Sequence, residues 1–227
     1  MQHPVGYTVR NGRAEMVNFG ALLSNPQVIF ELSHVLMGAL LTGATIICGL
    51  AAFQLLKKRS LSDENKQIYH KTMRIGLWLM LIFSIGSVTA GDLQMQYLIK
   101  EQPMKFAATE MVYKTTGDKA PWTVVGVANP KTHQVYGNID IPDMLSVLSY
   151  HKTTGAVKGM DEVNAQLEKK YGTKIANHKM NYYVPVNTLF WSFRVMAGFG
   201  ALMMLVSIVG LIMTRRGKET LYQHRWC

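Results

Sequence analysis

Two ionisable residues lie within a long apolar run near the start of the chain. Glu31 and His34 occur in FELSHVLMGAL, and the run continues as LTGATIICGLAAF. Ionisable side chains inside membrane-spanning segments are rare and usually functional. Helical spacing places small residues below His34 on its face: Gly38, Thr42, Thr45 and Gly49. This stripe of small residues has two interpretations. Another helix packs closely against it and forms a hydrogen bond with His34, or a flat macrocycle lies against the backbone beside the imidazole.

A haem with a histidine ligand needs a second ligand or an open site, and a later apolar run offers one. In FWSFRVMAGFGALMMLVS, Met196 lies among small residues at a depth similar to that of His34. A buried methionine is usually core filler, but the matched depth favours a ligand. His/Met ligation fills both axial positions and favours electron transfer. Arg194, near the same level, either extends its charge to the membrane surface or pairs with a haem propionate.

The composition places these residues in a membrane. Of the 227 residues, 48% are hydrophobic, and three runs are long enough to cross a bilayer, which takes about 20 apolar residues. We predict transmembrane helices in residues 26–58, 75–99 and 186–214. The His34 and Met196 candidates therefore lie on the first and third spans.

The basic residues predict the orientation of the spans. They cluster between the first two spans and directly after the third: Lys57, Lys58, Arg59, Lys66, Lys71 and Arg74, then Arg215, Arg216 and Lys218. Short cytoplasmic loops collect Lys and Arg. Residues 59–74 are thus predicted as a short basic cytoplasmic loop and 215–227 as a cytoplasmic tail. The net charge of +10 reflects this topology, and no recognition pattern for nucleic acid accompanies it.

Two segments are predicted outside the cytoplasm. Residues 1–25 are expected to form an amphipathic segment on the outer surface, with a helix in NGRAEMVNFGALLSNP that ends at the cap Asn25-Pro26 of the following span. Residues 100–185 form a long loop with short helices at QPMKFAATEMVYKT and DEVNAQLEKK, and WTVVGV with QVYGNIDI as a possible small hairpin. The fold class predicted is an all-α membrane protein with three transmembrane helices and this long extracytoplasmic loop.

Several separated motifs together resemble subunit I of the cytochrome bd quinol oxidases. They are MQHPVGY, RAEMVNFGALLSNP, FELSHVLMGALLTGA, GDLQMQYLIKEQPMKFAATE and FWSFRVMAGFG, in the order of that family. The resemblance implies that His34 and Met196 are the axial ligands of a low-spin haem b and that Arg194 binds this cofactor. It also implies that residues 100–185 are the quinol-binding loop, with Lys105 and Glu110 at the quinol. By spacing alone these two are solvated charges.

The resemblance places the chain in the middle of the subunit. The family's amino-terminal histidine ligand and its late GRQPW motif have no counterpart in this sequence. We therefore expect the high-spin haem b and haem d of the complete enzyme to be held elsewhere, and the isolated chain, as a fragment or split-gene piece, to be inactive. Five further histidines are predicted to be ordinary surface residues: His70, His133, His151, His178 and His224.

The function implied is electrogenic quinol oxidation in a bacterial cytoplasmic membrane by an oxidoreductase that generates a proton-motive force. The expected partners are ubiquinol or menaquinol, the remaining helices of subunit I, subunit II and membrane lipid. One alternative is a non-catalytic haem-binding or structural membrane subunit. A transporter fragment would need a charged path through the bundle, whereas the spans carry Glu31 and His34 near one end only.

Overall fold

The computed structural model describes residues 5–57, 61–171 and 181–215. The chain divides into two units. We call Met1–Gln27 with Asp92–Met196 the loop unit, and Val28–Gly91 with Ala197–Cys227 the helical unit. Two long helices, α3 (Asp63–Glu101) and α7 (Val186–Met213), contribute residues to both.

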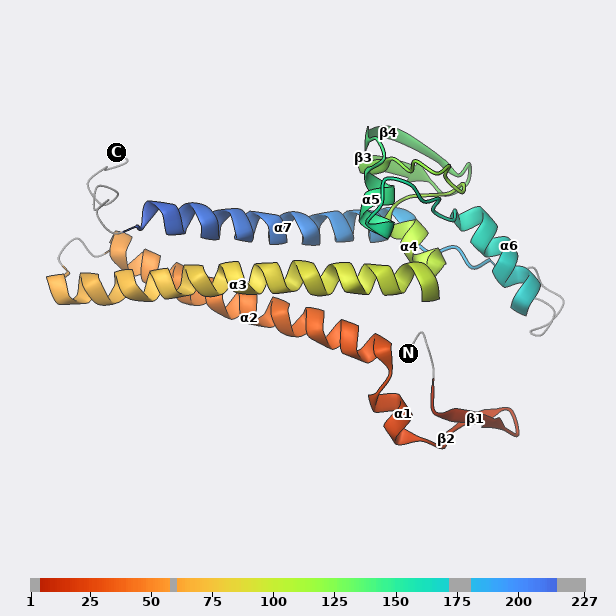
Figure 1. Cartoon of the computed structure of the whole chain (residues 1–227), viewed down its shortest axis with the longest axis horizontal. Helices are drawn as coiled ribbons and strands as arrows, with labels where there is room; N and C mark the ends of the chain where they lie inside the picture. The colour runs from red at the N-terminus through yellow and green to blue at the C-terminus, as the bar shows by residue number, and fades with distance from the viewer. Residues whose placement is uncertain (1–4, 58–60, 172–180, 216–227) are drawn as a thin grey trace. The chain divides into compact units, whose positions relative to one another are not determined.

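Three helices in the described residues are long and apolar enough to cross a membrane. They are α2 (Pro26–Lys57), α3 and α7, with 32, 39 and 28 residues (Figure 1). At 1.5 Å per residue even the shortest is about 42 Å long, which exceeds the roughly 30 Å of a bilayer core. The prediction of three transmembrane helices is confirmed.

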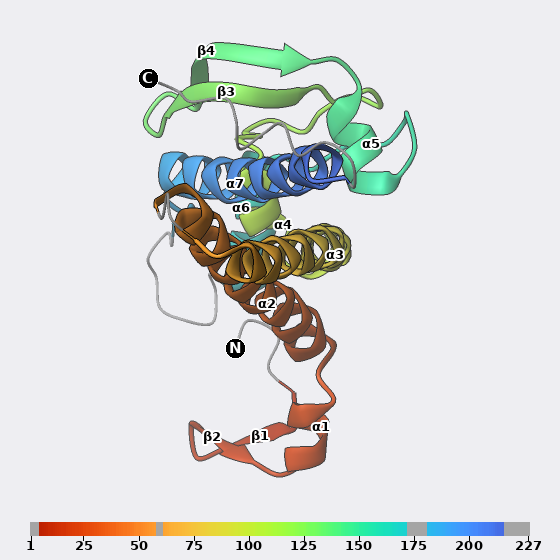
Figure 2. The same cartoon turned by 90° about the vertical axis from the view of Figure 1, so that its left-hand side faces the viewer.

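Small residues let the helices of the helical unit pack closely. A core of Leu41, Ala44, Leu77 and Met80 joins α2 and α3, and Met203 and Leu211 of α7 pack against it. A Cβ atom at Gly76 would lie 2.9 Å from the Cβ of Cys48, so the glycine permits the approach of α2 to α3 (Figure 2). Large apolar side chains elsewhere on these helices are exposed, as expected for surfaces that contact lipid or other protein.

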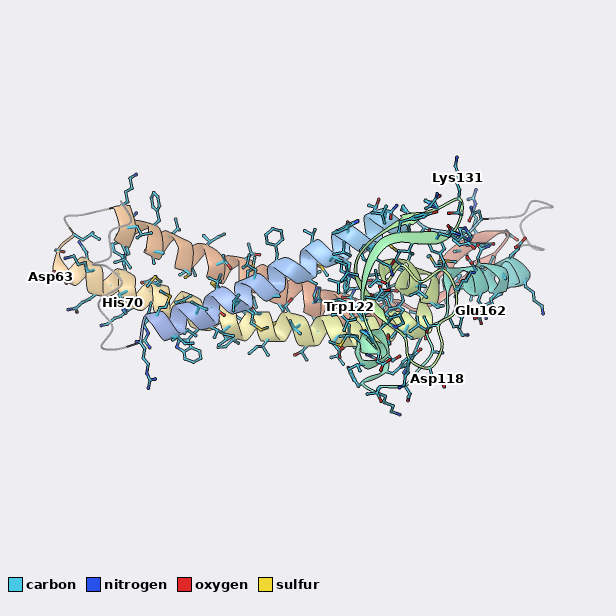
Figure 3. The ribbon with its side chains drawn as sticks, turned by 90° about the horizontal axis from the view of Figure 1, so that it is seen from above. Asp63, His70, Asp118, Trp122, Lys131 and Glu162 are labelled. Atoms are coloured by element: carbon cyan, nitrogen blue, oxygen red, sulfur yellow. The ribbon has the colours of Figure 1, made fainter. Side chains whose placement is uncertain are left out.

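Helix α3 begins inside the range predicted as a cytoplasmic loop. The Ser62 hydroxyl accepts from the Asn65 N–H at 3.4 Å, and Asp63 and Glu64 occupy the first turn, where acidic side chains favour the positive helix end. Asp63 and His70 lie near this start (Figure 3). Hydropathy predicts the apolar part of α3 but cannot detect the polar turns with which the helix begins.

The predicted amino-terminal amphipathic helix is largely wrong. Residues 7–16 form an antiparallel hairpin of β1 (Tyr7–Arg10) and β2 (Arg13–Met16), and only α1 (Phe19–Leu23) is helical. Asn11 and Gly12 have φ of 51° and 75°, the left-handed pair that two-residue hairpin turns need. The predicted cap at Asn25 is confirmed, because its side chain accepts from the Gln27 N–H at 3.0 Å.

The rest of the loop unit contains the predicted hairpin and both predicted helices. Strands β3 (Trp122–Asn129) and β4 (Gln134–Ile141) pair antiparallel, and α5 (Met144–Tyr150) packs against β3 (Figure 2). Helix α4 (Pro103–Thr109) contacts α6 (Met160–Tyr171). A buried core joins α4, α6 and the start of α7 through Met104, Ala107, Met160, Val163, Val186 and Phe190.

Candidate functional site

The short helix α4 presents Glu110 at its carboxyl end. Pro103 begins the helix, where its missing N–H costs nothing. The helix ends in a Schellman motif: the Val112 N–H donates to the Ala107 carbonyl at 2.8 Å, and the Met111 N–H donates to Ala108 at 3.2 Å. Met111 adopts φ of 60°, a conformation that usually requires glycine. The backbone next to Glu110 is therefore strained, as is common at functional sites.

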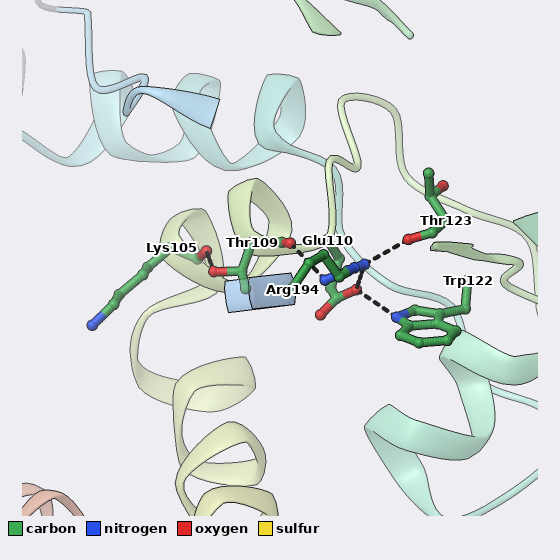
Figure 4. A network of polar contacts seen from close by, with 6 residues as sticks. All are labelled: Lys105, Thr109, Glu110, Trp122, Thr123 and Arg194. Carbon is green, nitrogen blue, oxygen red and sulfur yellow. Dashed lines mark hydrogen bonds and ion pairs between the residues drawn. The ribbon is translucent and has the colours of Figure 1, made fainter. Parts of the chain in front are cut away.

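Glu110 forms a buried ion pair with Arg194 (Figure 4). The Arg194 Nη2 lies 2.8 Å from Glu110 Oε2, and their side chains are 8% and 4% exposed. The Trp122 indole N–H donates to the same oxygen at 3.0 Å. Both bonds fall on Oε2, and within the described part of the chain Oε1 accepts no hydrogen bond.

The Arg194 guanidinium is held by backbone carbonyls and aromatic rings as well. It donates to the carbonyls of Thr109 at 3.2 Å and Thr123 at 2.6 Å. Its central carbon lies 4.2 Å from the ring centre of Phe190, one turn earlier on α7, a favourable cation–π arrangement. The Arg194 Nε is buried and has no partner among the described residues, so one donor remains for another group.

A side-chain clamp holds the start of α7 against β3. The Asn187 side chain accepts from the Ala128 N–H and donates to the Ala128 carbonyl, each at 2.8 Å. These two bonds align α7 with the strand that carries Trp122 and Thr123. They explain how Arg194, two turns further along α7, reaches the Thr123 carbonyl.

The electrostatics of Glu110 combine two opposing effects. Burial raises the pKa of the Glu110 carboxyl above its ordinary value of 4.5, and the Arg194 charge with the hydrogen bonds from Arg194 and Trp122 partly offsets this. The carboxyl thus holds a proton more readily than an exposed glutamate does. This property suits a group that must accept and release protons.

Lys105 does not join this network. Its side chain is half-buried and points away from the Glu110 carboxylate (Figure 4), as the five-residue spacing on a helix requires. The Lys105 carbonyl accepts from the Thr109 hydroxyl at 2.8 Å. The structure therefore brings together Glu110 and Arg194 but leaves Lys105 on another face of α4.

His34 has a geometry that suits a haem ligand. Its Nδ1 lies 3.1 Å from the Ser87 carbonyl oxygen of α3. Because a carbonyl only accepts, Nδ1 carries the hydrogen, and the lone pair on Nε2 remains for a metal. Metal-binding histidines usually have such a second partner. A Cβ at Gly91 would lie 3.2 Å from the ring, so a glycine there leaves room for the imidazole.

The side chain of Met196, the second predicted ligand, is not buried. It is 51% exposed, unlike the core methionines Met104 and Met160 of the same unit, which are buried. Met196 belongs to the loop unit and His34 to the helical unit. Their pairing as two ligands of one iron stays a prediction.

Sequence reasoning missed the contributions of Trp122 and Thr123. The sequence predicts Trp122 only as the start of a strand, yet its N–H donates to Glu110 and its ring centre lies 5.1 Å from the Arg194 central carbon. The signal available was a tryptophan, whose N–H needs a partner when buried. Thr123 contributes its backbone carbonyl, which every residue type has, so the sequence cannot indicate this contact.

Comparison with known proteins identifies the family. A family model for cytochrome bd terminal oxidase subunit I matches residues 1–227. The chain belongs to this family. It is 44% identical over 218 residues to the cytochrome bd ubiquinol oxidase subunit 1 of Bacillus subtilis (strain 168), covering 96% of this chain and 44% of the relative. It is 26% identical to the cytochrome bd-II ubiquinol oxidase subunit 1 of Escherichia coli (strain K12), covering 100% of this chain and 53% of the relative.

The fold is that of a bd oxidase. The structure of bd oxidase from Geobacillus thermodenitrificans matches with a TM-score of 0.75 at 24% identity, over 97% of this chain and 47% of that one. The chain spans about half the length of the curated relatives it matches. Its membership of the subunit I family implies haem cofactors and an integral membrane protein.

Proposed function

We propose that this chain is the quinol-oxidising, low-spin haem b-binding part of a cytochrome bd quinol oxidase. The observation that carries the proposal is the buried ion pair between Glu110 and Arg194. It joins the end of α4 in the long loop to α7, two residues before Met196. A proton-accepting group is thereby attached to the helix of a proposed haem ligand. The relatives named as ubiquinol oxidase subunits support this function.

The proposed proton acceptor is Glu110. Arg194 and Trp122 occupy Oε2, so a quinol hydroxyl donates to Oε1, and the carboxylate takes the proton as the quinol loses electrons. Arg194 keeps the carboxylate in one orientation. Lys105 points elsewhere from α4, and we assign it a hydrogen bond to another part of the quinol head group. Ubiquinol and menaquinol both carry the hydroxyl groups that this mechanism requires.

We assign a low-spin haem b to His34 and Met196. His34 would bind the iron through Nε2, with Nδ1–H held by the Ser87 carbonyl, and Met196 would supply the sulfur. The Arg194 Nε, which has no partner among the described residues, would donate to a haem propionate. When bound, a haem with these two ligands supplies one-electron transfer at a raised potential. The complete enzyme would hold a high-spin haem b and haem d for oxygen reduction.

The proposed setting is a bacterial cytoplasmic membrane with the long loop outside. The partners are the remaining helices of subunit I, subunit II and membrane lipid. Quinol oxidation then releases protons outside, while oxygen reduction takes protons from the cytoplasm. This separation makes the reaction electrogenic without a proton pump.

The variant Glu110→Gln tests the role of the carboxylate. The amide oxygen can still accept from Arg194 and Trp122, but the amide nitrogen cannot take a proton. In the complete oxidase we expect kcat for quinol oxidation to fall by roughly 10²–10⁴-fold. Wild-type activity should fall on the acidic side at a pH above 4.5, because protonated Glu110 cannot accept. The variant should lack that acidic limb.

Two controls make this test specific. Glu64→Gln removes the same charge from an exposed position at the start of α3 and should leave turnover unchanged. His34→Ala should abolish the low-spin haem bands in reduced-minus-oxidised spectra, whereas Glu110→Gln should keep them. Wild-type turnover in Glu110→Gln, or intact low-spin bands in His34→Ala, would refute the corresponding assignment and favour a non-catalytic subunit or another ligand.

A further inference from the structure

Four segments of the loop unit meet at a cluster of titratable side chains away from Glu110. We call it the His133 cluster; its members are His133 in the β3–β4 turn, Asp161 in the first turn of α6, Tyr183 before α7 and Tyr113 after α4. The prediction that His133 is an ordinary surface residue is wrong, because its side chain is only 30% exposed and is paired. His178 and His224 lie outside the described residues.

The contacts of His133 determine which ring nitrogen is available. Its Nδ1 lies 2.8 Å from Asp161 Oδ1, and the Tyr183 hydroxyl donates to the same oxygen at 2.7 Å. A carboxylate only accepts, so His133 Nδ1 carries the hydrogen and Nε2 presents its lone pair. The carboxylate orients the imidazole and stabilises its charged form, as in catalytic histidine–carboxylate pairs.

Two tyrosines hold the imidazole plane. The His133 ring stacks on Tyr113 with centroids 4.8 Å apart and planes 14° apart, and Tyr183 lies 4.8 Å away on a tilt of 49°. Burial, the hydrogen bond to Asp161 and the Asp161 charge raise the pKa of Tyr183 to about 12, so Tyr183 remains a donor at neutral pH. The buried Tyr113 hydroxyl has no partner among the described residues, which leaves it available to a water or ligand.

The cluster is fixed to the segment that follows Glu110. The Asp161 N–H donates to the Tyr113 carbonyl and the Met160 N–H to the Val112 carbonyl, each at 3.0 Å. Tyr113 itself is three residues after Glu110. The start of α6 is therefore anchored to the chain just beyond the proposed proton acceptor.

We propose that His133 is a second proton-accepting residue of the quinol loop, which takes protons released at the quinol and delivers them to bulk water. This inference rests on the proposed function. The step is a proton transfer without electron movement. An N–H bond forms at Nε2 as an O–H bond of a carrier water or hydroxyl breaks, and the imidazolium then returns the proton to solvent. Imidazole is the side chain whose ordinary titration lies between about pH 5 and 8.

The groups that face His133 favour this role. Among the described residues, Asp161 is the charged group in contact with it, and Tyr113 and Tyr183 present neutral hydroxyls. Lys131, in the same turn, extends away from the hairpin (Figure 3) and is exposed. Glu162, the next residue on α6, accepts from the Thr115 hydroxyl and the Gln166 amide. One carboxylate thus compensates the imidazolium charge when it forms.

The variant His133→Asn separates proton transfer from structure. His133 has φ of 54°, which asparagine tolerates, and the asparagine amide can donate to Asp161 as Nδ1 does. It has no site for a proton. In the complete oxidase we expect kcat to fall about tenfold. This loss is smaller than the 10²–10⁴-fold usual for a general acid or base, because solvent water partly replaces His133 as the proton acceptor. We expect KM and the melting temperature to remain unchanged. Added imidazole should restore part of the rate.

A matched control is His151→Asn. His151 also has φ of 54° and an aspartate partner, Asp92 at 3.1 Å, but its side chain is 63% exposed; we expect wild-type kinetics. Asp161→Asn keeps an acceptor but removes the charge that stabilises imidazolium. We therefore expect Asp161→Asn to slow turnover, as His133→Asn does.

The outcomes are distinct. A wild-type rate and pH profile in His133→Asn would overturn the inference, and so would a lower rate that imidazole does not restore and that accompanies a lower melting temperature. Glu110→Gln in the same preparation tests the proposed function separately. A slow Glu110→Gln with a wild-type His133→Asn would refute only the role of His133, whereas a wild-type Glu110→Gln would refute the function on which it rests.

Discussion

At the residue scale, we expect the buried ion pair of Arg194 and Glu110 to matter for stability as well as for the proposed quinol chemistry. Both side chains are more than nine-tenths buried, and removing one partner of a buried pair typically costs about 3–5 kcal/mol because the other charge is left uncompensated. We expect Arg194→Leu to lower the melting temperature of the complete oxidase clearly. The double variant Glu110→Gln/Arg194→Leu should lose less than the sum of the single losses, because it buries no lone charge.

The control for this cycle is Arg10→Leu. Arg10 pairs with Glu15 at 3.8 Å in the exposed amino-terminal hairpin, where ion pairs contribute little. Equal effects of Arg194→Leu and Arg10→Leu, or additive losses in the double variant, would contradict the stabilising role of the buried pair.

The residue types of the site could be predicted from the sequence, but their partnership could not. An imidazole in an apolar run is easily recognised in the sequence. The hydrogen bond of His34 to the Ser87 carbonyl is compatible both with a packing role and with a haem-ligand role. Arg194 and Glu110 are 84 residues apart, so no helical periodicity relates them. Their contact depends on how β3 and α7 are clamped, which is a tertiary effect.

At the element scale, long-range hydrophobic patterns were more informative than short polar ones. Hydropathy predicts α2, α3 and α7 because about 20 apolar residues are needed to cross a bilayer. The same measure missed the polar first turns of α3, which begin at Asp63. The amphipathic pattern predicts a helix through Asn11-Gly12, whereas this dipeptide is a strong hairpin signal and both residues adopt positive φ in the turn.

The docking of α6 beside the segment after Glu110 depends on a glycine. A Cβ at Gly159 would lie 2.4 Å from the Tyr113 carbonyl oxygen and from the Lys114 carbonyl carbon. Gly159→Ala must therefore displace backbone, at a cost of about 1–3 kcal/mol typical of overpacking. We expect faster proteolysis within the loop unit and slower quinol oxidation. Gly117→Ala is the matched control, because its Cβ would meet nothing within 4 Å; equal protease resistance of the two variants would contradict the docking role.

At the scale of the whole molecule, the distribution of charge predicts which side of the membrane each end of α3 faces. Basic residues surround the start of α3, from Lys57 before it to Lys66, Lys71 and Arg74 within it. Arg215 follows α7. A membrane protein retains such clusters in the cytoplasm. Since α3 is a candidate single span of 39 residues, we predict that the loop after it lies on the opposite side, where the proposed quinol oxidation would release its protons.

Cysteine labelling in intact cells checks this orientation. In a background with Cys48 and Cys227 replaced by alanine, Lys131→Cys should react with a membrane-impermeant maleimide from outside. Asp63→Cys, whose parent side chain is 93% exposed at the start of α3, should react only after the membrane is permeabilised. The reverse pattern would place the loop in the cytoplasm. Protons from quinol would then be released on the side from which oxygen reduction takes them, and the reaction could not build a proton-motive force by this separation.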